Sequence, residues 1–177
     1  RKTLRGASLG AFQKNCVIFR MRIDSKAVSR LVKELRLISD ETLSRVESSI
    51  ESGKRDLLSA LVEGGYVGER EAAEIASDIL GVSVARVSDM DIPDHVLRVI
   101  PFSVARAERI IAIRFDDRGL AVAMQDPTNV RIPDFLVKKT GMPVRVFLAA
   151  PSDIDFGLGL YTRDLGKTFD DMMSERI

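Results

Sequence analysis

The sequence predicts an α+β fold: a helical subdomain of two tandem helix-turn-helix repeats packed on a small α/β subdomain with about three mainly antiparallel strands. Three observations lead to this prediction. Apolar residues recur at helical spacing through residues 25–81. After Gly81 the pattern changes to short apolar runs bounded by turn residues. The 177 residues, 45% of them hydrophobic, suffice for one domain or for two small subdomains that share a packed interface.

Four short helices are expected in the first half, because its apolar residues form four groups at helical spacing. The groups are Val28, Leu31, Val32 and Leu35; Leu43, Val46 and Ile50; Leu57, Leu58, Leu61 and Val62; and Ala72, Ile75, Ala76 and Ile79. Residues 39–42 and 68–71 supply capping polar groups and acidic side chains, which stabilise helix N-termini. Each of these segments should begin the second helix of a pair.

The two helix pairs are internal copies at an offset of 29 residues. Val32 then aligns with Leu61, and the later pairs are Leu43 with Ala72, Val46 with Ile75 and Ile50 with Ile79. One copy cannot bury its apolar stripe alone, so the copies should pack on each other or on the second half. Gly64 and Gly65 should permit the tight bend inside the second copy.

The second half begins with a short predicted strand at 82–87 and two short helices, 93–99 and 101–106, each opened by a proline. Strands at 110–113 and 120–124 flank the turn 116–119 and should be antiparallel neighbours. A helix at 130–139 should end at Gly141, followed by a third strand at 144–148. Ser152 should cap a closing helix that runs to residue 161.

These elements divide the chain into four parts. Residues 1–23 are a basic extension, 24–81 the helical repeats, 82–162 the α/β subdomain and 163–177 a tail or linker. The extension has no acidic residue, and its basic residues are Arg1, Lys2, Arg5, Lys14, Arg20 and Arg22. Such a segment could attract an anionic surface or keep a tail solvated, and we favour the solvated tail. Met21 would make a natural start for the folded part.

Bulk composition excludes several classes of protein. A formal charge of +1 argues against a dedicated nucleic-acid binder, which would carry a strong cationic excess. The single cysteine, Cys16, cannot form an intramolecular disulfide, so the cytoplasm is the default compartment. No apolar run in the sequence approaches the roughly 18 residues of a membrane span.

No catalytic, cofactor-binding or metal-binding constellation is expected. Residues 166–168 read Gly-Lys-Thr, as at the end of a phosphate-binding loop, but the glycine required five positions earlier is Tyr161. His95 and Cys16 have no partners at a useful spacing for a metal or a nucleophile. Asp116 and Asp117 precede Gly119 and favour a hairpin turn over a catalytic pair.

The run 120–129 is the most distinctive part of the second half. Its apolar residues suit a buried strand, which Asp126 and Pro127 stop because proline has no N–H for a ladder. Asp126 and Asn129 could border a ligand at the end of the strand, but a capping and turning role is favoured.

Residues 25–162 resemble the N-terminal domain of the secretion and pilus-assembly ATPases, the type II secretion protein E family. The resemblance rests on the two repeats and on the order of several short segments: 65–67, 79–82, Pro101 with Ala105 and Arg106, 121–128, Gly141 and Tyr161.

That family implies a domain that precedes a hexameric motor and docks on a cytoplasmic platform protein of the inner membrane. The expected function is therefore a non-catalytic regulatory or docking domain, or a stand-alone adaptor, that is cytoplasmic and recruited to the inner membrane through its partner. The motor's nucleotide-binding core lies outside these residues.

Some members of the family bind cyclic di-GMP through the repeats, each of which has Arg-Leu-Gly at its start, a glycine at its turn and a glutamine at its end. In the first copy the arginine, the two glycines and the glutamine fall on Ala27, Ser29, Arg36 and Ile50. In the second copy they fall on Asp56, Leu58, Gly65 and Ile79, and Arg55 fits only after a slip of one residue. Because an aspartate would repel a phosphate, the sequence predicts weak or no cyclic di-GMP binding.

DNA binding by the helix-turn-helix pairs is a third hypothesis. Acidic residues stand where recognition residues would lie, namely Asp40, Glu41, Glu69 and Glu71. These positions disfavour nucleic acid as a partner.

Overall fold

The computed structural model describes residues 23–50 and 56–174, with the backbone alone for 163–174. The expectations for the basic extension before Ile23, for Cys16 and Met21, and for Arg55 fall outside the described residues.

The four predicted helices of the first half are confirmed. They are α1 (Ser25–Glu34), α2 (Asp40–Ser49), α3 (Leu57–Glu63) and α4 (Glu69–Leu80). The predicted caps form: the Ser39 hydroxyl accepts a hydrogen bond from the Thr42 N–H at 3.3 Å, and the Glu71 carboxylate accepts one from the Gly68 N–H at 3.0 Å. Both bonds satisfy donors that a helix start leaves unpaired.

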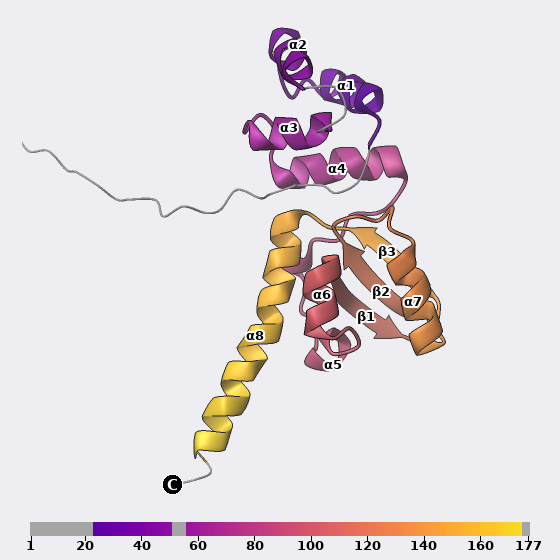
Figure 1. The fold of residues 1–177 in the computed structure, drawn as a ribbon, viewed down its shortest axis with the longest axis vertical. Helices are drawn as coiled ribbons and strands as arrows, with labels where there is room; N and C mark the ends of the chain where they lie inside the picture. The colour runs from indigo at the N-terminus through magenta and orange to yellow at the C-terminus, as the bar shows by residue number, and fades with distance from the viewer. Residues whose placement is uncertain (1–22, 51–55, 175–177) are drawn as a thin grey trace, which may run out of the picture.

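The helical half stands at one end of an elongated molecule, with α3 and α4 between α1 and the sheet (Figure 1). Its core contains the aligned apolar residues of both copies, including Val32, Leu61, Leu43 and Ile75, each at most 1% exposed. Leu148 and Ala150 of the second half join the same core. The helical repeats therefore pack both on each other and on the α/β half, as expected.

The α+β fold is confirmed, and its sheet is mixed. The strands are β1 (Ile110–Asp116), β2 (Gly119–Met124) and β3 (Val144–Leu148), in the order β1-β2-β3. The predicted antiparallel pairing holds for β1 and β2, whereas β3 lies parallel to β2. The parallel pair follows from the intervening helix α7 (Arg131–Thr140), because a crossover helix returns the chain to the same end of the sheet.

The turn between β1 and β2 brings Gly119 against the start of β3. A Cβ atom at Gly119 would lie 2.2 Å from the Pro143 carbonyl oxygen, and the φ of Gly119 is +109°. The Leu120 N–H donates to that same carbonyl at 3.0 Å. Glycine is therefore required here for a close approach of two backbones.

The predicted strand at 82–87 is wrong apart from one bridge between Val84 and Leu148. The Leu148 N–H donates to the Ser83 carbonyl at 2.9 Å and the Ala85 N–H to the Leu148 carbonyl at 2.8 Å. Both bonds are made to the last residue of β3. Soon after Ala85 the chain turns into the 3-10 helix η1 (Val87–Asp89). The apolar side chains of Ala85 and Val87 are buried, which explains the strand-like pattern.

The remaining helices are α5 (Asp94–Leu97), α6 (Phe102–Glu108) and α8 (Pro151–Ser174). Pro93 and Pro101 precede α5 and α6 as expected, and Gly141 ends α7 with a φ of +69°. The closing helix differs from the prediction: it begins at Pro151 rather than being capped by Ser152, and it continues to Ser174. Proline suits a first helical position because that N–H is not needed.

Tyr161 fixes α8 against α5 and α6. Its hydroxyl donates to two carbonyl oxygens, that of Leu97 at 2.9 Å and that of Ile100 at 3.1 Å. Burial raises the pKa of the Tyr161 phenol to about 12. None of the helices within the described residues is long and apolar enough to cross a membrane.

Candidate ligand and docking sites

The internal repeat extends to the backbone of the two turns. Arg36 and Gly65, which are equivalent at the offset of 29 residues, both adopt the left-handed conformation, with φ of 51° and 71°. The Leu37 N–H donates to the Val32 carbonyl and the Tyr66 N–H to the Leu61 carbonyl, again at equivalent positions. These bonds close the helix ends in the same way in both copies. The turn geometry is thus kept in the first copy although an arginine replaces the glycine.

In the first copy the aligned ligand positions lie on α1 and at the end of α2. Ala27 and Ser29 are within α1, and Ile50 follows the last residue of α2. Ser29 and Ile50 border a hollow of about 220 Å³, whose other lining residues are Ser25, Lys26, Glu47 and Leu57. The Ser29 hydroxyl donates to the Glu47 carboxylate inside this hollow. A carboxylate there disfavours an anionic ligand.

In the second copy the arginine position has a structural role. Asp56 caps α3, because its carboxylate accepts from the Ser59 N–H at 2.8 Å and from the Ser59 hydroxyl at 2.7 Å. Leu58 is fully buried in the helical core, and Ile79 is half-buried against it. Asp56 and Leu58 are therefore committed to the fold at positions where the family's motif has ligand contacts.

Polar side chains join the helical half to the α/β half. The Asp153 carboxylate of α8 is 2% exposed and accepts from the Ser88 N–H at 3.0 Å and the Ser88 hydroxyl at 2.8 Å. Arg70 of α4 approaches the same carboxylate at 3.7 Å and donates to the Ser88 hydroxyl at 2.7 Å. Beside it, the Ser152 N–H donates to the Glu69 carboxylate at 3.0 Å. We call Arg70, Ser88 and Asp153 the interface triad.

A second polar connection lies at the end of the sheet. Arg109 ends α6 with a φ of 54° and donates to the Gln125 side-chain oxygen at 2.7 Å, to the Pro151 carbonyl at 3.2 Å and to the Asp155 carboxylate. Neither Arg109 nor the interface triad was predicted from the sequence. For Asp153 the available signal was an acidic residue near a helix start, and for Arg109 there was none.

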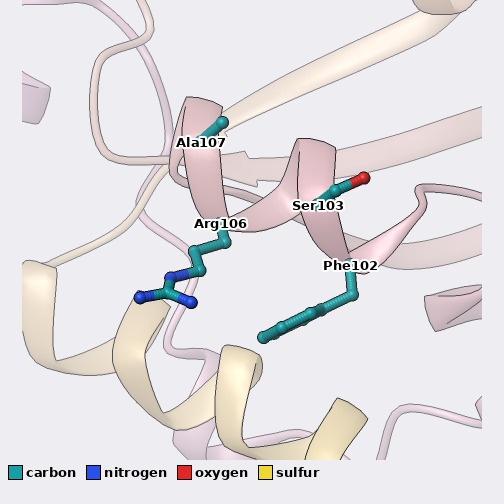
Figure 2. A pocket seen from close by; sticks show the side chains of 4 residues that line it. All are labelled: Phe102, Ser103, Arg106 and Ala107. Carbon is teal, nitrogen blue, oxygen red and sulfur yellow. The ribbon is translucent and has the colours of Figure 1, made fainter.

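A larger hollow, of about 610 Å³, lies beside α6 and is lined by Phe102, Ser103, Arg106 and Ala107. Figure 2 shows Phe102 and Arg106 pointing toward the turns of α8, with Ser103 and Ala107 directed away from them. The rings of Phe102 and Tyr161 have centroids 5.5 Å apart. All four lining residues come from one short helix, so this hollow presents no converging set of polar groups.

The residues considered for chemistry are dispersed. His95 is exposed on α5, and Asp116 accepts a hydrogen bond from the Arg118 N–H within the turn between β1 and β2. Residues 166–168 lie inside α8 and form no phosphate-binding loop. Within the described residues, no three His, Cys, Asp or Glu side chains gather to hold a metal ion.

The run 120–129 adopts the predicted strand and turn. The Asp126 carboxylate accepts from the Thr128 N–H at 3.0 Å, and the Asn129 side-chain oxygen accepts from the Arg131 N–H at 3.2 Å. Pro127 lies between them, after β2 and before α7. The polar side chains of this segment thus turn the chain between a strand and a helix.

Comparison with known proteins places this fold in context. Residues 80–166 match the MshEN domain. The chain is 25% identical over 145 residues to the type IV pilus assembly ATPase PilB of Myxococcus xanthus, a match that covers 82% of this chain. The match covers only 25% of the length of that relative.

Two solved structures have the same fold. MshE with cdg (cyclic di-GMP) superposes with a TM-score of 0.61 and 19% identity, over 79% of this chain and 99% of the other. The N-terminal domain of XpsE gives a TM-score of 0.55 and 20% identity, over 78% and 96%. Because MshE was solved with cyclic di-GMP, these comparisons do not support the expectation that this ligand is unlikely here.

Proposed function

This chain belongs to the family of N-terminal domains of type II secretion and type IV pilus assembly ATPases, and we propose that it is a non-catalytic docking domain. Its partner is the cytoplasmic domain of an inner-membrane platform protein. The domain is cytoplasmic, reaches the membrane through this partner, and acts on an ATPase core that is in the same chain or in a protein it adapts.

The observation that carries the proposal is a complete repeat scaffold whose ligand positions have changed. Both turns keep their left-handed residue, while Asp56 caps a helix and Glu47 occupies the hollow of the first copy. A scaffold maintained without its ligand residues indicates another use for its surface. Leu35 and Tyr66 remain 54% and 41% exposed on that scaffold, and exposed apolar and aromatic side chains are typical anchors of protein interfaces.

A pull-down with purified platform cytoplasmic domains tests this function. Leu35→Ser and Tyr66→Ser should each weaken capture by roughly ten-fold or more, as expected for interface anchors. Phe115→Ser is the matched control, because Phe115 is 40% exposed on β1, away from the repeats. Failure of every candidate platform domain to bind, or an equal loss with the control, would count against the proposal.

A cyclic di-GMP sensor is the alternative function. It is favoured by the fold shared with MshE, which was solved with cyclic di-GMP. Isothermal titration separates the two functions. Micromolar binding of cyclic di-GMP that survives physiological salt would establish the sensor and displace the docking role as the primary one.

A further inference from the structure

Charge is strongly segregated along this nearly neutral chain. Residues 1–33 contain nine basic side chains and one acidic side chain, Asp24, for a formal charge of +8. Residues 34–177 contain 18 basic and 25 acidic side chains, for a formal charge of −7. Such an asymmetry along the sequence indicates attraction to a polyanion.

The described part of the basic segment is α1, whose orientation is fixed. Val28 and Val32 are at most 1% exposed and face the core of the helical half. At 3.6 residues per turn, Lys26, Arg30 and Lys33 fall within an arc of about 60° on the opposite side of the helix. All three are exposed, so α1 presents a rigid row of cations, which we call the basic stripe.

Among the described residues, the basic stripe has no acidic partner that neutralises it. None of its three residues forms an ion pair with another described residue. The nearby helix α2 carries acidic side chains, but Glu41 pairs with Arg45 at 3.2 Å, and the Glu47 carboxylate accepts a hydrogen bond from the Ser29 hydroxyl. Unpaired cations held on one fixed face retain their attraction for an external anionic surface.

We propose that the basic stripe binds peripherally to the surface of an anionic phospholipid bilayer. Figure 1 places α1 near one end of the long axis and the last turns of α8 near the other. The acidic remainder of the chain is repelled by the same surface, so α1 faces the membrane and the end of α8 at Ser174 points away from it. This contact involves lipid headgroups directly and does not depend on the platform protein proposed above.

The stripe suits a bilayer better than it suits the other polyanions. It has no aromatic side chain on which bases could stack, and the acidic start of α2 at Asp40 and Glu41 opposes a nucleic-acid groove. Protein interfaces rely on desolvated anchors, whereas a row of exposed cations adsorbs to a lipid surface by charge alone.

Co-sedimentation of the 177-residue chain with vesicles tests the proposal. The chain should bind vesicles of phosphatidylcholine with phosphatidylglycerol, should not bind phosphatidylcholine alone, and should be released by salt. One basic residue near an anionic surface changes the partition constant roughly five-fold, so Lys26→Gln/Arg30→Gln/Lys33→Gln should lower it by roughly a hundred-fold.

The matched control is Arg131→Gln/Lys138→Gln/Lys139→Gln, which removes three exposed cations from α7. Its partition constant should lie within about two-fold of the wild-type value, because a difference of that size is smaller than the effect of one basic residue near the surface. Circular dichroism checks that both triple variants are folded.

Three outcomes would overturn the proposal. They are absence of binding to anionic vesicles at low salt, equal losses in the two triple variants, and tighter stripe-dependent binding of a DNA or RNA duplex that displaces the vesicles. The last outcome would assign the stripe to nucleic acid.

Discussion

The guanidinium Nε of Arg70 lies 3.7 Å from the Asp153 carboxylate, across the junction between the helical repeats and the α/β half. The carboxylate is almost completely buried, while the Arg70 side chain is 54% exposed. Ser88 completes the triad by donating two hydrogen bonds to Asp153. A buried carboxylate needs such partners, because an unpaired one would be costly in a low-dielectric interior. The relative position of the two halves is therefore coupled to this one side chain.

The first prediction concerns Asp153. Asp153→Ala should lower the free energy of unfolding by about 2–4 kcal/mol, because it leaves the Ser88 N–H and hydroxyl without their buried acceptor. Urea unfolding measures the change. Glu74→Ala is the control, since Glu74 pairs with Arg86 at 3.1 Å where both side chains are more than half exposed. That exposed pair should be worth about 0–1 kcal/mol. Equal costs for the two variants would show that the triad does not hold the halves together.

The second prediction concerns the turn of the first repeat. Arg36→Gly should raise the free energy of unfolding by about 0.5–1 kcal/mol, because Arg36 has a φ of 51° and glycine adopts the left-handed region without a Cβ penalty. The change is read from the midpoint of urea unfolding. Arg30→Gly, in the middle of α1, should instead destabilise by about 1 kcal/mol. A loss of stability in Arg36→Gly would mean that the arginine side chain makes a compensating contribution.

The third prediction is a pH dependence. The pKa of Tyr161 is raised by burial from 10.0 to about 12, so the folded state holds this proton more tightly than the unfolded state. The stabilisation is complete below pH 10 and is lost as the pH rises from about 10 to 12. Tyr161→Phe should remove this component and cost about 1–2 kcal/mol near neutral pH, because the bonds to Leu97 and Ile100 are lost.

Urea unfolding between pH 8 and 11 checks the third prediction, with Tyr66→Phe as the control. Tyr66 is 41% exposed, so Tyr66→Phe removes a tyrosine hydroxyl without removing a buried one. Parallel profiles for the wild type and Tyr161→Phe would show that another group controls alkaline stability.

Local signals predicted most of the fold. Helix periodicity located the four repeat helices, because Val28, Val32 and their equivalents repeat every three or four residues and face one core. The turn glycines and prolines located β1, β2 and the end of α7. The strand predicted at residues 82–87 was wrong, because a short buried apolar run is compatible both with a strand and with a segment that enters a 3-10 helix.

Contacts between residues far apart in the chain could not be predicted from the sequence. Asp153 and Ser88 are 65 residues apart, and Arg109 reaches Asp155 across 46 residues, so neither contact leaves a periodic pattern. The repeat located the aligned ligand positions but did not reveal the structural role of the residues there. Only the structure shows that Asp56 caps a helix and that Leu58 belongs to the core. The parallel direction of β3 likewise depended on how α7 crosses the sheet.

The fourth prediction uses the retained scaffold of the first repeat. Because Ala27 and Ile50 are half-buried and Arg36 is exposed, these positions accept the family's arginine, glutamine and glycine. Leu58 in the second copy is fully buried and would leave a cavity as glycine. Ala27→Arg/Arg36→Gly/Ile50→Gln should therefore stay folded and bind cyclic di-GMP at least roughly ten-fold more tightly than the wild type, because an arginine supplies a charge-assisted bond to phosphate.

Isothermal titration measures this gain, and Ala60→Arg, a half-buried position outside the aligned set, controls for added charge. The gain should be larger still when Glu47→Gln is added, since that change removes the carboxylate from the hollow beside Ser29. Equal affinity in the wild type and the triple variant would mean that the changed residues do not account for ligand selectivity. The docking interpretation of the repeats would then lose its main support, because it rests on ligand positions that have been replaced while the turns at Arg36 and Gly65 keep their shape.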